Sequence, residues 1–182
     1  MLGLEDRASP KAQQVAQTEA IRQITRELED LPPDKARYVA KFAYILSRVA
    51  RADQEISAAE TEEMERIVRD VGGLPPEQAV VVVHAAKTRN LVFGGTDNYL
   101  VTREFHRVAA PEDKLRLLDC LFAVSAAGST ITAVEDNEIR QISRELLIEH
   151  RDYIAIRSKY RDHLAVLKDL PGYDRPPEAP GA

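Results

Sequence analysis

Residues 50–60 read ARADQEISAAE, and residues 125–135 read SAAGSTITAVE, a weaker copy of the same pattern. In both copies an apolar segment ends in small residues, a short polar loop follows, and an isoleucine stands at the same place, Ile56 or Ile131. A Ser or Thr with Glu three positions later then opens the next segment, which is the sequence signature of a capped helix start. The pattern predicts two related helix-loop-helix hairpins.

A constant offset relates the two copies, since Glu60 and Glu135 are 75 positions apart (135 − 60). The same offset aligns further apolar residues on both sides of the loop: Leu46 with Leu121, Val49 with Val124, Met64 with Ile139 and Ile67 with Ile142. Because these matches need no gap, we interpret the copies as a pseudo-repeat, although apolar periodicity alone supplies some of them.

Apolar periodicity predicts helices along most of the chain. We expect them from Ser9-Pro10 to Leu31, from Pro33 to Val49, from Ser57 to Val71, after Pro76, from Asn98 to Val108, after Pro111, from Thr132 to Leu147 and from Asp152 to Leu167. The run AVVVVHAA at 79–86 fits a strand about as well as a helix, but a lone strand has no sheet to join. Gly94-Gly95 predicts a break before the helix at Asn98.

The predicted fold is therefore all-α, a single-domain bundle of about seven or eight helices with two pseudo-repeated hairpins. A chain of 182 residues suffices for one hydrophobic core and is short for two. We divide it into residues 1–32, an amphipathic helix with its lead-in, residues 33–168, the helical domain, and residues 169–182, a Pro-rich tail that we expect to be disordered.

Composition excludes some classes of partner. The net charge of −5 provides no overall field toward nucleic acid or anionic lipid, so we expect no nucleic-acid partner. The N-terminus carries charge where a secretory signal is apolar, and no apolar run approaches the length of a membrane span, ~20 residues. The single cysteine, Cys120, lies in an apolar run, as a small buried residue would. We expect a cytoplasmic protein without a transmembrane segment.

Local enzyme signatures are missing from the sequence. The four histidines form neither a Glu-x-x-His pair nor a His-Glu-x-x-His zinc motif, and there is no phosphate loop or nucleophile elbow. His84 lies among valines and alanines, where a core or interface histidine is the simpler interpretation. We expect no catalytic activity, and the alternative is an enzyme whose site gathers scattered carboxylates and histidines without a local motif.

The two loops resemble a known family. Its pattern, Ala-x-Ala-Asp-Gly-x-Ile-x-x-x-Glu after an apolar helix, is typical of the tellurite-resistance TerB-like family, which includes the N-terminal region of the DjlA co-chaperone. The first copy matches at Ala50, Ala52, Asp53, Ile56 and Glu60, with Gln54 where the family prefers Gly. The second matches at Ala127, Ile131 and Glu135, with Gly128 and Ser129 in the Asp and Gly positions. The resemblance covers roughly residues 35 to 168.

The resemblance implies a compact bundle of about seven helices whose two loop regions approach each other around an acidic patch. It also implies a non-enzymatic module of a stress or resistance response, with divalent-metal binding and assembly with protein partners as the usual proposals. A J domain is not implied, because the His-Pro-Asp triplet that it needs is absent.

The sharpest chemical hypothesis is a divalent cation, calcium or magnesium, held by carboxylates from both hairpins. The candidate ligands are Asp53, Glu55, Glu60 and Glu135, with Glu63, Asp136 and Glu138 beside them. Helix capping alone also explains Glu60 and Glu135. The loop is not an EF-hand, since its twelfth residue counted from Asp53 is Met64. Without a carboxylate at Gly128, any site is asymmetric.

The segment 149–163 combines basic and aromatic residues, namely Arg151, Arg157, Lys159 and Arg161 with Tyr153 and Tyr160. Such a composition is favoured at protein interfaces. The interleaved Glu149, Asp152 and Asp162 favour a salt-bridged solvated face instead, and partner docking is the alternative. We expect a protein partner, and neither its identity nor the oligomeric state follows from the sequence.

Overall fold

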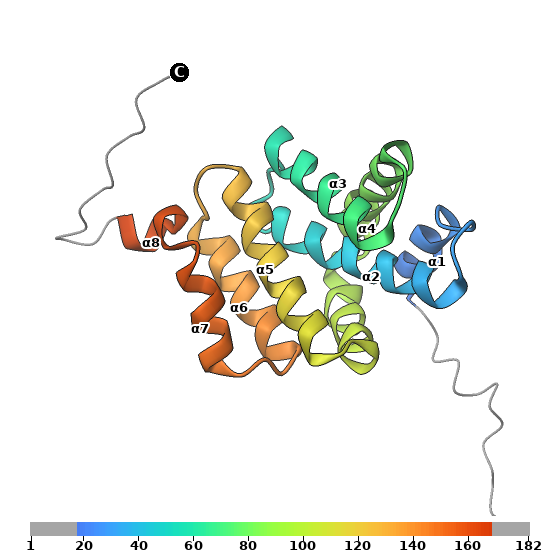
Figure 1. The fold of residues 1–182 in the computed structure, drawn as a ribbon. Helices are drawn as coiled ribbons and strands as arrows, with labels where there is room; N and C mark the ends of the chain where they lie inside the picture. Colours follow the sequence, from blue (N-terminus) through green and yellow to red (C-terminus); the bar gives the residue numbers. More distant parts are fainter. Residues whose placement is uncertain (1–17, 169–182) are drawn as a thin grey trace, which may run out of the picture.

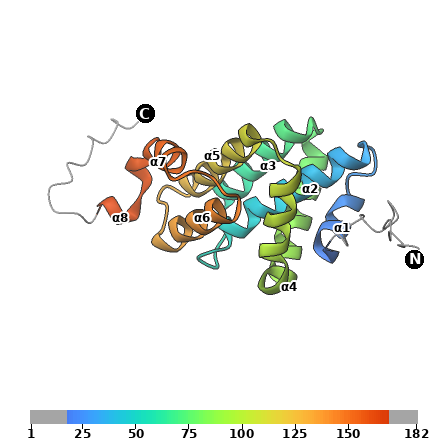
Figure 2. The ribbon, with the colours of Figure 1, turned by 90° about the horizontal axis from the view of Figure 1, so that it is seen from below.

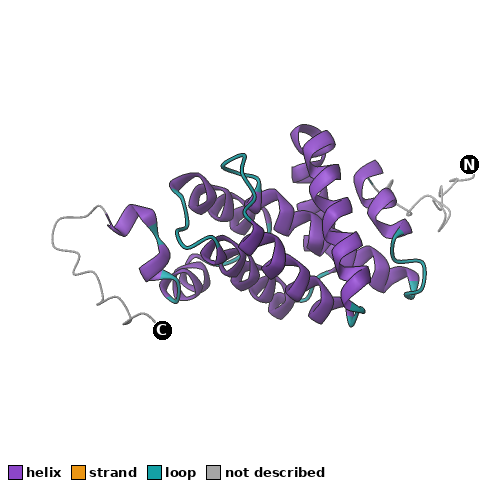
Figure 3. Cartoon of the chain, turned by 90° about the horizontal axis from the view of Figure 1, so that it is seen from above, coloured by secondary structure: helices purple, strands orange, loops and turns teal. Residues whose placement is uncertain are grey.

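Helices make up most of the described chain, residues 18–168 of a computed structural model (Figure 1). They are α1 (Glu19–Arg26), α2 (Pro33–Ala50), α3 (Ala58–Gly72), α4 (Pro76–Val108), α5 (Pro111–Ala127), α6 (Ala133–Glu145), α7 (His150–Ser158) and α8 (Ala165–Lys168), with a 3₁₀ turn, η2 (Arg161–His163), before α8. Between residues 18 and 168 there is no β-strand (Figure 3). The predicted all-α bundle of seven or eight helices is confirmed.

Helix α2 is the centre of the bundle and packs against α1, α3, α4, α5 and α6 (Figures 1 and 2). Thirteen of its 18 residues are buried, on every side of the helix. A helix surrounded in this way has few positions for exposed polar side chains, which explains the dense run of small and apolar residues between Val39 and Ala50. The buried charged residues in that run, Lys41 and Arg48, are ion-paired with Glu104 and Glu138. Phe42 packs edge-on against Phe105 of α4, with ring centroids 6.0 Å apart, an arrangement that aromatic pairs prefer.

Both predicted capping boxes are present. At the start of α3, Glu60 N–H donates to Ser57 Oγ at 3.1 Å, and Ser57 N–H donates to Glu60 Oε2 at 2.7 Å. At the start of α6, Glu135 N–H donates to Thr132 Oγ1 at 3.2 Å, and Thr132 N–H donates to Glu135 Oε2 at 2.8 Å. Each box satisfies backbone donors that a helix start leaves unpaired, so it fixes where the loop ends.

The predicted break at Gly94-Gly95 is wrong, because α4 continues through both glycines for 33 residues. Asn90 Nδ2 donates to Asn98 Oδ1 at 2.9 Å, and Tyr44 Oη of α2 donates to the same oxygen at 3.1 Å. Asn90 and Asn98 are eight residues apart, about 12 Å along a straight helix, so their contact requires α4 to bend at the glycines without being interrupted. A glycine in a helix costs only about 1 kcal/mol relative to alanine, and packing against α1, α2 and α3 outweighs that preference.

The predicted last helix, from Asp152 to Leu167, is also wrong as one element. α7 ends at Ser158, and after η2 the chain runs beside the loop before α6. Ile131 N–H donates to His163 O at 2.8 Å, and Ala165 N–H donates to Ile131 O at 3.0 Å. Leu164 between them is 1% exposed, so its burial and this backbone pairing stop the helix from continuing.

The structure describes only part of the predicted N-terminal segment, residues 1–32, and does not describe the predicted tail. α1 begins at Glu19, where Thr18 Oγ1 accepts from Ile21 N–H at 3.4 Å. The predicted start at Ser9-Pro10 and the tail at 169–182 lie outside the described residues.

Candidate functional site

The loop between α2 and α3 and the loop between α5 and α6 enclose a cleft of about 600 Å³, the acidic cleft. Its lining residues are Asp53, Glu55, Ile56, Ser57, Glu60, Gly128, Thr130, Thr132 and Glu135. All four predicted cation ligands are among them. The structure therefore brings together carboxylates that lie up to 82 positions apart in the sequence (135 − 53).

Glu60 and Glu135 form the buried part of the cleft, with 5% and 1% of their surfaces exposed. In each, Oε2 accepts from the backbone of the capping box. Glu135 Oε1 is buried and has no hydrogen-bond partner, and neither has the buried hydroxyl of Ser125 close by. A buried carboxylate oxygen without a well-placed donor is unfavourable, and the Ser125 hydroxyl is close enough to this carboxyl group to stabilise its charge in part.

Burial raises the pKa of Glu135, and the neighbouring Glu60 carboxylate raises it further. The hydrogen bonds from Thr132 and the nearby hydroxyl of Ser125 oppose this shift without cancelling it. The charged form of Glu135 is therefore destabilised in the cleft, and a positive charge placed between the two glutamates would relieve both causes.

Gly128 lies beside Glu60. A Cβ atom at this position would lie 3.4 Å from Glu60 Cδ, an ordinary van der Waals contact with the carboxyl group. The φ of Gly128 is −74°, an angle that any residue can adopt. A short side chain can therefore replace glycine here and would point at Glu60.

The two loops share an unusual backbone position. Gln54 has φ of 72° and Ser129 has φ of 84°. Both angles fall in the left-handed region that favours glycine. These residues are 75 positions apart (129 − 54), so they occupy equivalent places in the two copies. The family's preference for Gly there has this physical reason. The relation between the two whole hairpins stays a prediction.

Asp53 and Glu55 are exposed at the rim of the cleft, where Asp53 Oδ1 accepts from Glu55 N–H at 3.2 Å. The other acids considered from the sequence do not line it and are ion-paired instead. Glu63 contacts Arg66 at 2.6 Å, Asp136 contacts Arg157 at 2.7 Å, and Glu138 pairs with Arg48. Of the seven acids, four line the cleft and three do not.

No three His, Cys, Asp or Glu side chains between residues 18 and 168 are arranged so that they alone would hold a metal ion. The cleft supplies two buried carboxylates and two at its rim. A cation there would need water or backbone oxygens to complete its coordination.

Contacts from the C-terminal part of the chain reach the second loop, and sequence reasoning missed them. Lys168 Nζ donates to Thr130 Oγ1, a residue of the cleft, at 3.0 Å, and His163 Nδ1 lies 3.1 Å from Ser129 O. No motif marks these residues. The only sequence signal was Leu164, an apolar residue in a segment otherwise rich in charge.

The basic segment 149–163 largely has the salt-bridged character predicted for it. Arg151 pairs with Glu149, Arg157 with Asp136 and Lys159 with Asp119.

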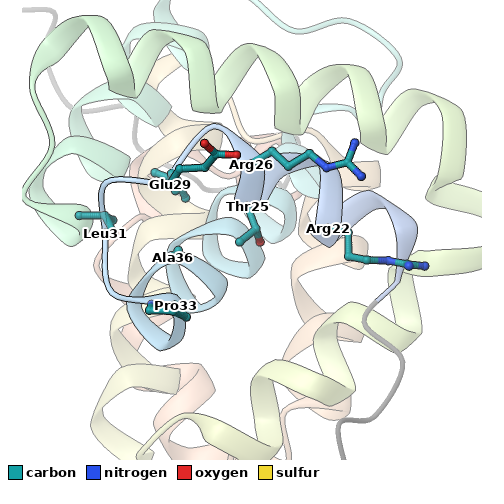
Figure 4. Close-up of a pocket in the computed structure, with 8 residues that line it drawn as sticks. Arg22, Thr25, Arg26, Glu29, Leu31, Pro33 and Ala36 are labelled. Atoms are coloured by element: carbon teal, nitrogen blue, oxygen red, sulfur yellow. The ribbon is translucent and has the colours of Figure 1, made fainter.

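Another cavity, of about 340 Å³, lies beside α1 and the start of α2 (Figure 4). There Arg22 and Arg26 extend away from Leu31 and Pro33, and no histidine or cysteine lines the space (Figure 4).

The comparison with protein families agrees with the loop geometry. The family model described as tellurite resistance protein TerB matches residues 40–158, which is more than half of the chain and includes both loops. No curated protein and no solved structure matches the sequence. Within residues 18–168 no helix is long and apolar enough to span a bilayer. The chain belongs to the TerB family.

Proposed function

We propose that this chain is a cytoplasmic helical module of a stress or resistance response, which binds a divalent cation in the acidic cleft and acts through protein contacts. One observation carries the cation part of this proposal. Glu60 and Glu135 line the same cleft, nearly all of their surface is buried, and burial and the Glu60 carboxylate both raise the pKa of Glu135.

Calcium and magnesium are the cations that this cleft favours, because hard cations prefer oxygen ligands. Magnesium keeps several waters and takes one or two carboxylates, which suits Glu60 and Glu135 alone. Calcium takes six to eight oxygens, so it would also draw on Asp53 or Glu55 at the rim. The volume of the cleft, about 600 Å³, leaves room for the waters that either ion needs.

Calorimetric titration of calcium, magnesium and manganese into chelator-treated protein tests this binding. Wild type should release or absorb heat with at least one ion and melt at a higher temperature in its presence. Glu135→Gln and Glu60→Gln should lose both effects. Glu62→Gln is the matched control, since Glu62 is an exposed residue of α3 outside the cleft, and the same charge is removed.

Absence of heat and of any melting shift with all three ions would contradict cation binding. The same conclusion would follow if Glu62→Gln weakened binding as much as Glu135→Gln, because the effect would then arise from net charge and not from the cleft.

The protein-contact part rests on the surface of α4. Of the eleven exposed large hydrophobic side chains between residues 18 and 168, seven lie on this helix: Val80, Val81, Leu91, Val92, Tyr99, Leu100 and Val108. α4 extends beyond the other helices at the lower edge of Figure 2. Contiguous exposed apolar surface is typical of an interaction site, and the adjacent pairs Val80–Val81, Leu91–Val92 and Tyr99–Leu100 are where α4 would provide it.

Affinity capture from stressed cells tests the contact surface. Leu91→Glu with Val92→Glu should remove proteins that wild type retains, because a charge in an apolar contact is costly to desolvate. Val134→Glu with Leu147→Glu, two exposed hydrophobic positions on other parts of the surface, is the control and should retain them. Identical sets of captured proteins for both double variants would contradict a role for α4.

Nothing observed favours the enzyme alternative. The acidic cleft has no histidine in its lining. A second pocket, between α6 and α7, is lined by His150 but by no carboxylate.

A further inference from the structure

A separate pocket of about 270 Å³ lies between α6 and α7. We call it the basic pocket, and its lining residues are Arg140, Ser143, Arg144, Ile148, His150, Tyr153 and Ile154. It shares no residue with the acidic cleft. No aspartate or glutamate lines it, in a chain whose net charge is −5.

Two unneutralised arginines give this pocket its charge. Arg140 and Arg144 are four positions apart on α6, so they lie on the same face of the helix. Within the described residues neither has a carboxylate within 4.0 Å, whereas Arg48, Arg66 and Arg157 are all ion-paired. Arg140 lies beside the hydroxyl of Tyr153, which is neutral, so that contact leaves its charge uncompensated. Both guanidinium groups can therefore pair with an anionic ligand.

A buried hydroxyl lies between the two arginines in sequence. Ser143 is 4% exposed and lines the pocket. A serine hydroxyl can donate a hydrogen bond to an anionic oxygen, so Ser143 can supply one donor to a ligand in this pocket.

The start of α7 adds backbone donors. Its N-cap residue, Glu149, makes no side-chain cap hydrogen bond, and the first helical residue, His150, lines the pocket. The first N–H groups of a helix and its dipole favour an anion. The Glu149 carboxylate is turned to Arg151 at 3.1 Å, and Asp136, which faces Tyr153, is neutralised by Arg157.

We propose that the basic pocket binds a phosphate monoester. Arg140 and Arg144 would pair with the phosphate oxygens, and Ser143 and the N–H groups of α7 would donate to them. Two guanidinium groups match a dianion better than a singly charged carboxylate. The volume of about 270 Å³ accommodates a phosphate with a short stem against Ile148 and Ile154, and lies just below the ~300–1,000 Å³ of typical small-molecule sites.

Titration of ¹⁵N-labelled protein with O-phosphoserine tests this site, with inorganic phosphate, serine and acetate as further ligands and a chelator present throughout. The chelator keeps the result independent of the acidic cleft. O-phosphoserine should give saturable shifts of the Ser143, His150 and Tyr153 amides, and serine and acetate should not. Arg140→Ala with Arg144→Ala should weaken binding at least tenfold.

Two controls separate the pocket from general charge and from misfolding. Arg66→Ala with Arg69→Ala removes the same two charges from α3 and should leave binding within about twofold of wild type. His150→Gln, at an exposed position, should weaken binding about threefold with the amide spectrum otherwise unchanged. The expected spectrum of Arg140→Ala with Arg144→Ala is also that of a folded protein, since both side chains are exposed.

The ligands distinguish the source of the phosphate. Tighter binding of a phosphoserine peptide than of inorganic phosphate would support a phosphate carried by a protein, and equal binding would support a free phosphate or a small phosphorylated metabolite. Linear, unsaturated shifts, or equal weakening by the α3 double variant, would overturn the site.

Discussion

Arg48 and Glu145 form a buried ion pair between α2 and α6, with Arg48 Nη1 2.7 Å from Glu145 Oε2 and Nη2 3.2 Å from Oε1. The same guanidinium pairs with Glu138 and donates to Thr102 Oγ1 of α4 at 3.0 Å. Only 3% of the Arg48 side chain and 9% of the Glu145 side chain are exposed. Because Glu135 lies in the first turn of α6, this ion pair also fixes the helix that carries the most buried carboxylate of the acidic cleft.

Replacement of Arg48 should therefore be severe. Arg48→Met leaves Glu145 without its cation in the interior and Glu138 without its ion pair, and breaking a buried pair by removing one partner costs about 3–5 kcal/mol. Urea unfolding followed by circular dichroism measures this loss. Arg66→Met, on the exposed face of α3, breaks pairs with Glu63 and Asp70 and should cost about 0–1 kcal/mol. Similar losses for the two variants would contradict the role of Arg48.

A substitution at Gly95 tests the continuity of α4. In the structure Gly95 is helical, and a Cβ atom there would meet nothing within 4 Å. Gly95→Ala should then stabilise the protein by about 0.5–1 kcal/mol, because glycine loses more backbone freedom on helix formation. Thermal melts of the two proteins measure the difference. A lower melting temperature would mean that the helix is interrupted at this point, as the sequence alone predicted.

The features that followed from the sequence are those with a local cause. A Ser or Thr with Glu three positions later encodes a helix start without reference to the rest of the chain, and both such starts are where they were predicted. The approach of the two loops around an acidic patch was implied by the resemblance to the TerB-like family and not by any local pattern.

The features that could not be predicted depend on residues far apart in the sequence. Continuity of α4 depends on Tyr44, 54 positions from Asn98, and the end of α7 depends on backbone pairing between Ile131 and His163. The pairing of Arg48 with Glu145 spans 97 positions, and nothing near either residue indicates it. Local patterns cannot encode such contacts, because tertiary packing overrides them.

Cys120 should react slowly with thiol reagents. Burial raises the pKa of its thiol to about 11, from an ordinary value of 9.0, and the thiolate is the reactive form. A shift of two units lowers the thiolate fraction at pH 8 by about a hundredfold. Alkylation by iodoacetamide, followed by mass spectrometry, should be about a hundredfold slower in the native protein than in urea. The native rate should rise about tenfold for each pH unit up to about pH 11, whereas equal native and unfolded rates would contradict the burial.

Gly128→Asp should make the acidic cleft more dependent on a cation. The family's pattern has Asp at this position, and a Cβ atom there would lie 3.4 Å from Glu60 Cδ, so the new carboxylate would join Glu60 and Glu135. A further negative charge beside Glu60 and Glu135 should lower the melting temperature in chelator and strengthen calcium or magnesium binding at least tenfold, about 1.4 kcal/mol.

Gly128→Asn separates charge from crowding in this experiment, because it has the same shape without the carboxylate. The melting temperature of Gly128→Asn should fall only as far as the added bulk of the side chain lowers it. It should not recover when the cation is added. If Gly128→Asp and Gly128→Asn melt alike with and without cation, charge at the cleft has no effect on stability, and the cation part of the proposed function is contradicted.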